Sequence, residues 1–231
     1  MNIALLLAGG SGARLETETP KQLIPIGGKT IMEHTLDAFE QHPHIDQIVV
    51  VVNPQYKSEI EKITQQYQKV KKIVEGGAER HQSSWAAIEV CKDYPNANLI
   101  IHDAVRPMVD EETITKVIRA LEHYNAVTVA IPTTDTIYYV ENTLIQHIPD
   151  RNKLLRAQTP QAFKQHLIQK AYQAAFQQNE FAATDDCGVV AKFLPHEPIF
   201  VVPGNAHNIK ITHKEDLVVF TEQLKELRCE I

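Results

Sequence analysis

The hydrophobic residues of this chain form short, uninterrupted runs separated by longer amphipathic stretches. Residues 3–7 and 48–52 are apolar throughout, too short for helices, and typical of parallel strands buried on both faces. Because strands that alternate with helices form parallel sheets with right-handed crossovers, the pattern predicts an α/β fold. The other expected strands are residues 72–75, 99–102, 126–131 and 199–202, and the expected helices are residues 30–40, 55–69, 83–92, 110–124, 165–178 and 214–227.

The alternation breaks at about residue 134. Residues 137–140 and 144–148 are rich in β-branched and aromatic side chains and flank a turn at Glu141-Asn142, which predicts a β-hairpin. We expect this segment, roughly residues 134–157, to project as an arm from a single domain that spans residues 1–231. Apolar strand edges of this kind need a cover, and a second copy of the chain is the expected one.

Composition excludes several classes of function. The net charge of −6 leaves no general basic field for nucleic acid. Cys91, Cys187 and Cys229 lack the spacing of a disulfide framework or a structural zinc site, and Cys187 is expected to be a small buried residue. The first apolar run is too short to cross a bilayer and follows no basic leader, so no membrane partner and a cytoplasmic location are expected.

The carboxyl ends of parallel strands are where such sheets bind ligands. The first strand is followed by Gly9, Gly10, Ser11 and Gly12, a loop whose backbone N–H groups can approach an anion closely. Two cations, Arg14 and Lys21, come next, which is a combination that suits a triphosphate. The loop matches neither the Walker pattern nor the dinucleotide fingerprint, and taken alone it also fits an ordinary strand-to-helix turn.

Several motifs after strands occur together in one order: LLAGGSGARL, TPKQ, GGAERHQS, HDAVRP, DT, DRNKLLRAQTPQAF, ATDDC and NIKIT. In these motifs the chain resembles, from end to end, the polyol-phosphate cytidylyltransferases. The resemblance implies a Rossmann-like nucleotidyltransferase domain with a mostly parallel sheet and an arm that swaps across a homodimer. It also implies attack of a polyol-phosphate oxygen on the α-phosphorus of CTP, with Mg²⁺ present and pyrophosphate released.

The same resemblance implies roles for individual residues. Arg14, Lys21 and Lys210 are the expected catalytic cations, because nucleotidyl transfer needs positioning and charge neutralisation more than a covalent protein group. Lys210 lies between two isoleucines, so its charge requires a partner. The expected nucleotide-binding residues are Leu7, Ala8, Gly9, Gly10, Ser11, Gly12, Gly76, Gly77, Arg80, Ser83 and Asp103.

Other implied contacts concern the acceptor and the metal. Arg106, Thr136, Arg151 and Thr159 are expected to bind the acceptor, with Arg151 gripping its phosphate in the neighbouring subunit. Thr184 and Asp185 are expected to support them. Asp103 is a candidate metal or ribose contact, and the alternative for Asp103 and Arg106 is a buried ion pair. Many relatives carry an acidic residue where this chain has Ala78, which leaves base recognition more to the backbone.

The motifs indicate the chemistry more clearly than the acceptor. The doubled glycine of LLAGGSG and the DTIYY arm favour ribitol 5-phosphate, whereas DRNKLLRAQTPQAF favours 2-C-methyl-D-erythritol 4-phosphate. We favour the latter, because its agreement over residues 151–163 is the longest. The alternatives from other classes are a hexose 1-phosphate nucleotidyltransferase, a non-catalytic nucleotide-binding regulator and a structural oligomer.

Overall fold

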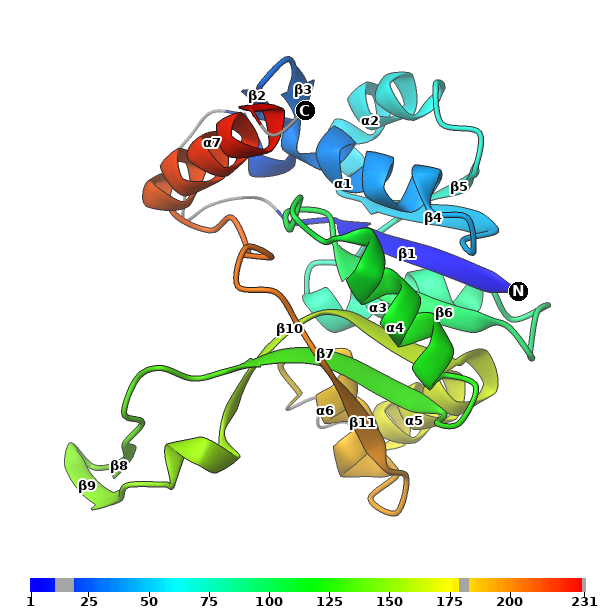
Figure 1. Cartoon of the computed structure of the whole chain (residues 1–231). Coiled ribbons are helices and arrows are strands. Elements are labelled where there is room, and N and C mark those ends of the chain that lie inside the picture. Colours follow the sequence, from blue (N-terminus) through cyan, green and yellow to red (C-terminus); the bar gives the residue numbers. More distant parts are fainter. Residues whose placement is uncertain (11–18, 179–182, 230–231) are drawn as a thin grey trace.

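The structure is a computed structural model that describes residues 1–10, 19–178 and 183–229. Its centre is a seven-stranded sheet in the order β11-β7-β10-β6-β1-β4-β5 (Figure 1). Every strand is parallel to the others except β10, which runs antiparallel to both of its neighbours. The strands are β1 (Asn2–Ala8), β4 (Gln47–Val52), β5 (Val70–Glu75), β6 (Asn98–Asp103), β7 (Ala126–Pro132), β10 (Leu155–Lys164) and β11 (Ile199–Pro203).

Helices cover both faces of the sheet, so the predicted α/β fold with a mostly parallel sheet is confirmed. One core cluster joins Ala4 and Leu6 to α1 (Ile31–Gln41), α2 (Lys57–Thr64) and α4 (Glu111–Ala120). The other joins Ile3 and Leu5 to α3 (Arg80–Glu89), α5 (Gln165–Gln177) and α6 (Asp186–Phe193). Successive side chains of β1 thus pack into the cores on opposite faces of the sheet. This explains why residues 3–7 are all apolar.

The last helix, α7 (Lys214–Cys229), packs Phe220 into a third, smaller cluster with Ile31, Val105 and Ile211. This cluster holds the C-terminal part of the chain beside the small hairpin of β2 (Pro25–Ile26) and β3 (Lys29–Thr30). Within the described residues, no helix is long and apolar enough to cross a membrane.

Helix boundaries follow local capping chemistry. Thr30 caps α1 in a capping box with Glu33, and Asp110 caps α4 by accepting from Thr113 N at 2.6 Å. The helix expected over residues 83–92 begins three residues earlier, at Arg80, and the one expected over residues 55–69 is a 3-10 turn followed by the short α2.

Two of the longer elements were not predicted. Residues 155–164 form β10 inside the sheet, so residues 155–157, which the sequence assigned to the arm, belong to the sheet, and residues 186–193 form α6. Both segments contain polar residues, and in addition β10 contains Pro160 and α6 contains Gly188. Local sequence patterns assign such residues to loops. Their stability comes from partners elsewhere in the chain, described below.

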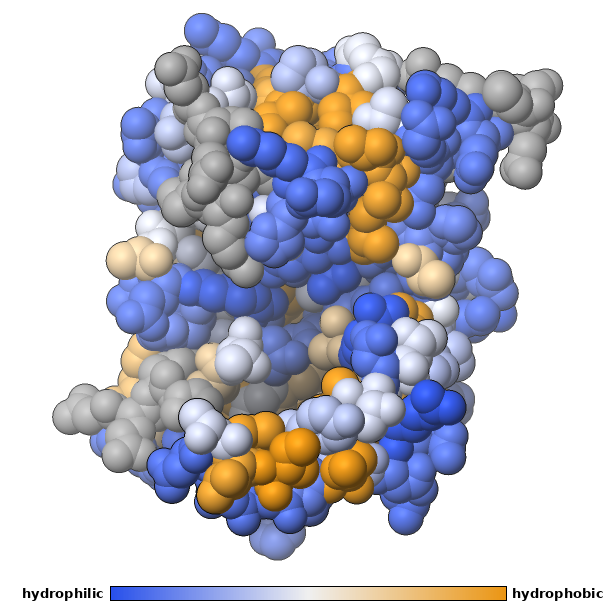
Figure 2. Space-filling model, turned by 90° about the vertical axis from the view of Figure 1, so that its left-hand side faces the viewer, coloured by the Kyte–Doolittle hydropathy of each residue, from blue (hydrophilic) through white to orange (hydrophobic). Residues whose placement is uncertain are grey.

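The arm leaves the body of the molecule between β7 and β10 (Figure 1). Its hairpin consists of β8 (Tyr139–Glu141) and β9 (Leu144–His147), as the sequence predicted, and its apolar side chains are exposed, Leu144 by 66% and Ile145 by 54%. Figure 2 views the side from which the arm projects and shows apolar surface at the bottom, at the level of the arm.

Candidate active site

A cavity of about 260 Å³ opens at the carboxyl ends of β1, β5 and β6. These strand ends lie on the side of the sheet from which the arm projects (Figure 1). Four segments, one of them containing Lys21 and Gln22, and one residue of the C-terminal part of the chain therefore meet where parallel sheets bind their ligands. The lining residues are Leu7, Ala8, Gly9, Gly10, Lys21, Gln22, Gly77, Ala78, Glu79, Arg80, Ser83, Asp103, Val105 and Lys210.

Most of the predicted nucleotide-binding residues thus line one cavity. Gly76 lies directly behind the lining and donates its N–H to the carbonyl of Val52 at 2.8 Å. Ser11, Gly12 and the expected catalytic Arg14 lie outside the described residues.

The glycines are required by close packing around Ser83. A Cβ on Gly76 would lie 2.5 Å from Ser83 Oγ, and one on Gly9 would lie 3.1 Å from the same atom. The hydroxyl of Ser83 therefore sits between the ends of β1 and β5, where side chains at the glycine positions would displace it. This places a buried hydroxyl at the wall of the cavity, and the nucleotide-binding role expected of Ser83 stays a prediction.

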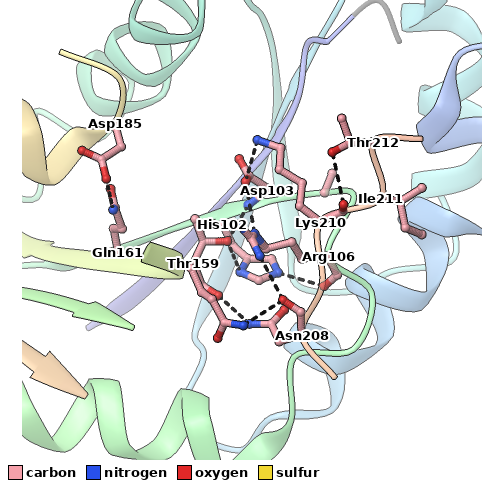
Figure 3. A network of polar contacts seen from close by, with 12 residues as sticks. His102, Asp103, Arg106, Thr159, Gln161, Asp185, Asn208, Lys210, Ile211 and Thr212 are labelled. Atoms are coloured by element: carbon pink, nitrogen blue, oxygen red, sulfur yellow. Dashed lines mark hydrogen bonds and ion pairs between the residues drawn. The ribbon is translucent and has the colours of Figure 1, made fainter. Parts of the chain in front are cut away.

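Asp103 is surrounded by cations. Its Oδ2 lies 3.0 Å from Lys210 Nζ and 3.3 Å from Arg106 Nε, and its Oδ1 lies 3.9 Å from Arg80 Nε (Figure 3). Burial opposes ionisation of Asp103, but the charges of Lys210, Arg80 and Arg106 prevail and hold the pKa of this carboxyl well below its usual range. Three cations around one carboxylate leave a local excess of positive charge beside the cavity, which suits a polyanion.

Arg80 has a second, buried partner that the sequence did not reveal. Its NH2 lies 2.8 Å from Oδ2 of Asp186, a fully buried residue whose other oxygen accepts from Tyr172 OH at 2.6 Å. Gln161 on β10 fixes the same turn, because its Oε1 accepts from the backbone N of Asp186 at 3.1 Å. Burial lowers the pKa of Arg80, but the charges of Asp186 and Asp103 raise it above its ordinary value.

The only hint of this arrangement in the sequence is the acidic pair in ATDDC, where the motif drew attention to Thr184 and Asp185 rather than to the next residue. Asp185 caps α6 through Gly188 N at 2.7 Å and accepts from Gln161 Nε2, also at 2.7 Å.

The side chain of Arg106 binds other groups of the protein. Besides its contact with Asp103, its NH1 donates to the carbonyl of Asn208 at 2.9 Å, and burial lowers the pKa of its guanidinium. The buried ion pair that the sequence left open for Asp103 and Arg106 is therefore present. The acceptor contact expected of Arg106 stays a prediction.

Thr159 is 4% exposed and links two strands of the sheet. Its Oγ1 accepts from the backbone N of Asp103 at 3.2 Å and lies 2.9 Å from Nδ1 of His102. Burial lowers the pKa of His102 to about 4, so its ring is neutral near pH 7. Its Nε2–H donates to the carbonyl of Arg106 at 3.1 Å, which leaves Nδ1 to accept from Thr159. The expected acceptor contact of Thr159 stays a prediction beside this internal role.

Lys21 is 8% exposed and donates from Nζ to the carbonyl of Ile211 at 3.0 Å, at the wall of the cavity. Its neighbour Gln22 has a role that the sequence did not indicate. The Nε2 of Gln22 donates to the carbonyls of Ala8 and Gly10, at 2.9 and 3.2 Å, and so holds the glycine loop in place. Gln22 is part of the TPKQ motif, but the neighbouring sequence does not indicate which backbone carbonyls its side chain binds.

The arm residues are not brought to the cavity of their own chain. Arg151 is exposed and donates from NH1 to the carbonyl of Thr134 at 3.4 Å, and Thr136 is exposed nearby. Within the described residues, neither lines the cavity.

The described part of the chain has no group of three or more His, Cys, Asp or Glu side chains placed to hold a metal ion. At the cavity the carboxylates are those of Asp103 and of the exposed Glu79. This donor set fits Mg²⁺ only as one or two ligands, with phosphate oxygens and water supplying the rest, which is how Mg²⁺ usually binds beside nucleotides.

Cys91 and Cys187 do not line the cavity. Cys91 and Cys187 are free and buried, as expected for Cys187, and burial raises the pKa of the Cys91 thiol to about 11.

The geometry agrees with what comparison with known proteins finds. A family model described as 2-C-methyl-D-erythritol 4-phosphate cytidylyltransferase (IspD) matches residues 2–226. The 2-C-methyl-D-erythritol 4-phosphate cytidylyltransferase of Thermobifida fusca is 45% identical over 224 residues, which cover 94% of this chain and 90% of that protein.

Two further similarities extend this result. The bifunctional ribulose 5-phosphate reductase/CDP-ribitol pyrophosphorylase Bcs1 of Haemophilus influenzae is 44% identical over 94% of this chain, which spans about half (47%) of that protein. The crystal structure of 4-diphosphocytidyl-2C-methyl-D-erythritolsynthase from Anaerococcus prevotii has a TM-score of 0.85 and 31% identity, covering 97% of this chain and 98% of the other. The resemblance seen in the motifs therefore holds from β1 to α7.

Proposed function

Because this chain belongs to the 2-C-methyl-D-erythritol 4-phosphate cytidylyltransferase family, we propose that it transfers the cytidylyl group of CTP to 2-C-methyl-D-erythritol 4-phosphate and releases pyrophosphate. One observation of the structure supports this most directly. A glycine loop, a recessed serine hydroxyl and the cations Lys21, Arg80 and Lys210 surround a single cavity at the carboxyl edge of the sheet. That combination offers backbone donors and positive charge to a nucleoside triphosphate.

The reaction joins two anions, so the chain must neutralise charge and hold the reactants in line. An oxygen of the acceptor phosphate forms a bond to the α-phosphorus of CTP, and the bond from that phosphorus to the β-phosphate oxygen breaks. Lys210 and Lys21, with Arg14 of the glycine loop, are the groups that we assign to the charge on the α-phosphate and on the leaving pyrophosphate. Asp103 holds the Lys210 ammonium at the cavity.

Asp103 and Glu79 are the cavity residues that would hold Mg²⁺. When bound, it would polarise the phosphoryl oxygens and neutralise charge on the departing pyrophosphate. The residues present can supply one or two of its ligands, and the nucleotide must supply others.

We further propose that two copies of the chain pair through their arms, and that the partner's arm completes each cavity. The support is the position of Arg151, which is exposed on an apolar arm and remote from its own cavity, together with the phosphate-binding role that the family resemblance implies. Pairing would also cover the exposed strands of the arm. We place the reaction in the cytoplasm, in keeping with the free thiols of Cys91 and Cys187.

The second candidate acceptor is ribitol 5-phosphate. The 44% identity with the bifunctional CDP-ribitol pyrophosphorylase favours it, whereas several 2-C-methyl-D-erythritol 4-phosphate cytidylyltransferases at 40–45% identity favour the proposed one. Both acceptors are short polyol phosphates. Because they differ little in size, a binding pocket discriminates between them by only about 1–3 kcal/mol.

The test is release of pyrophosphate from CTP with Mg²⁺, with the two acceptors assayed in parallel and Lys210→Ala as the inactive control. We expect a kcat/KM at least tenfold higher with 2-C-methyl-D-erythritol 4-phosphate. A reversed preference would assign the protein to ribitol activation. A folded protein that binds CTP but releases no pyrophosphate with either acceptor would overturn both assignments.

A further inference from the structure

Lys210 is carried by a segment with no regular structure. Between β11 and α7, residues 204–213 form neither helix nor strand. Such a loop has no ladder of backbone hydrogen bonds to define where its side chains lie, so other contacts must do so. Lys210 nevertheless reaches Asp103 at 3.0 Å with a side chain that is 35% exposed.

Asn208, two residues before Lys210, anchors this loop through both its side chain and its carbonyl. It is 1% exposed, and its side-chain Nδ2 donates to the carbonyl of Thr159 on β10 at 2.8 Å (Figure 3). Its own carbonyl accepts from Arg106 NH1 at 2.9 Å and from Gln158 Nε2 at 3.2 Å. Buried hydrogen bonds between side chains and backbone are what fix irregular segments.

The second anchor lies on the other side of Lys210. The N–H of Ile211 donates to the carbonyl of Val105 at 2.9 Å, and its carbonyl accepts from Lys21 Nζ at 3.0 Å. The backbone of Lys210 is thus held from both sides, by Asn208 against β10 and by Ile211 against the segment that follows β6.

The residue to which Asn208 is bound, Thr159, also contacts Asp103, the ionic partner of Lys210. Thr159 accepts from Asn208 Nδ2 through its carbonyl and from the backbone N of Asp103 through its hydroxyl. Both partners of the Lys210–Asp103 ion pair are therefore positioned against the same residue of β10, as Figure 3 shows. A displacement of the loop would move the ammonium but not the carboxylate.

We propose that Asn208 is a positioning residue for Lys210: its amide fixes the loop to β10, so that the Lys210 ammonium enters the cavity where the transferred phosphate is held. This rests on the function proposed above for Lys210. Asn208 itself is buried and does not line the cavity, so it acts through the lysine. A displacement of about 1 Å at a catalytic group costs on the order of a hundredfold in rate.

The experiment is a double-mutant cycle on pyrophosphate release. Asn208→Ala should lower kcat by roughly 10- to 100-fold and change the KM for CTP by less than about threefold. Lys210→Ala should lower kcat further, and adding Asn208→Ala to it should cause no additional loss. Asn208→Asp, which keeps the side-chain shape but replaces the Nδ2 donor with an oxygen, should behave like Asn208→Ala.

Asn205→Ala is the matched control. Asn205 lies in the same loop, where its Nδ2 donates to Asp110, the N-cap of α4, at 2.8 Å and its Oδ1 accepts from the backbone N of His207 at 2.8 Å, so its side chain does not bind β10. We expect kcat to change by less than about twofold in this variant.

The outcomes separate the inference from the function on which it rests. If Lys210→Ala leaves kcat unchanged, the role of Lys210 is wrong and Asn208 has no lysine to position. If Lys210→Ala is slow but Asn208→Ala lowers kcat by its full factor in that background, Asn208 acts elsewhere and the inference is wrong. Unfolding of both Asn208 variants, followed by circular dichroism, would equally contradict it, because Asn208 would then serve the stability of the fold.

Discussion

The guanidinium of Arg80 lies 2.8 Å from the carboxylate of Asp186, and this ion pair joins the start of α3 at the cavity to the start of α6 on the same face of the sheet. The remaining oxygen of Asp186 is held by Tyr172. Asp186, which does not line the cavity, therefore orients the guanidinium of Arg80 and so determines how close it lies to Asp103 at the cavity wall.

The first prediction concerns this pair. Asp186→Asn keeps the size of the side chain but removes the charge that orients Arg80, so the KM for CTP should rise about tenfold, or ~1.4 kcal/mol, with little change in kcat. The free energy of unfolding should fall by about 2 kcal/mol, less than for a fully buried pair because Arg80 is partly exposed. Steady-state kinetics and urea unfolding measure both.

Tyr172→Phe is the control for that experiment. It removes the hydroxyl that binds Asp186 and leaves the ion pair, so stability should drop by about 1 kcal/mol while the KM for CTP stays within twofold. An unchanged KM in Asp186→Asn would show that Arg80 needs no help from α6 to bind the nucleotide.

The second prediction concerns the space around Ser83. In Gly76→Ala the new methyl would lie 2.5 Å from Ser83 Oγ and 3.1 Å from Val51 Cγ1, so the serine must move. Thermal unfolding should show a destabilisation of about 1–3 kcal/mol, and the KM for CTP should rise. For stability, Gly10→Ala is the matched control, because its Cβ would meet nothing within 4 Å. Equal unfolding temperatures for the two variants would contradict the packing argument.

The third prediction is a pH dependence of stability with a definite sign. Burial lowers the pKa of His102 to about 4 in the folded chain, whereas an unfolded histidine has a pKa near 6.5. The stability that His102 contributes as a neutral residue is fully present above pH 6.5 and is lost as the pH falls towards 4, by about 2 kcal/mol between pH 7 and pH 5. Urea unfolding at the two pH values measures it.

His102→Gln isolates this contribution, because the amide Nε2 can still donate to the carbonyl of Arg106 but does not titrate. The variant should be less stable at pH 7 and should lose less on acidification than the original chain. Identical losses in the two proteins would mean that other groups carry the pH dependence.

The fourth prediction tests whether the partner's arm completes the cavity. Arg151→Ala should raise the KM for the acceptor without changing the KM for CTP, because the residue is remote from the cavity of its own chain. When Arg151→Ala and Lys210→Ala proteins are mixed, half of the pairs are mixed dimers with one intact site each. Up to about a quarter of the original activity should return.

The matched control for the mixing experiment uses two residues of the same cavity. Lys21→Ala mixed with Lys210→Ala should recover nothing, because both residues line the cavity of one chain and every site then lacks one of them. Recovery in this control, or none in the first mixture, would refute completion of the site by the partner.

The strands of the sheet differ in how far they could be predicted. β1 and β4 are apolar at nearly every position, because both faces are buried, and this leaves a clear pattern. β10 is as buried at its centre, but its side chains there include Gln158, Thr159 and Gln161. Gln158 Nε2, Thr159 Oγ1 and Gln161 Nε2 form hydrogen bonds with Asn205, His102 and Asp185, which are distant in the chain. Local propensity contains no information on such partners, so the strand was missed.

The same limit separates the residues that line the cavity from those that support it. Lys21, Ser83 and Lys210 were expected from motifs and lie together at the cavity. Gln22 and Asn208 belong to the same motifs, yet their roles depend on backbone carbonyls of Ala8 and Thr159. A carbonyl is present at every residue, so the sequence cannot distinguish the one that will be bound.

The place of β10 has a consequence for biosynthesis. In the sheet β10 lies between β6 and β7, although the ribosome makes it after both. β6 and β7 therefore cannot reach their final pairing in the sheet until residue 164 has been synthesised. A chain stalled after residue 132 and before residue 155 lacks both β10 and β11, so the β10-facing edges of β6 and β7 and the β11-facing edge of β7 are unpaired. We expect such an intermediate to be prone to aggregation.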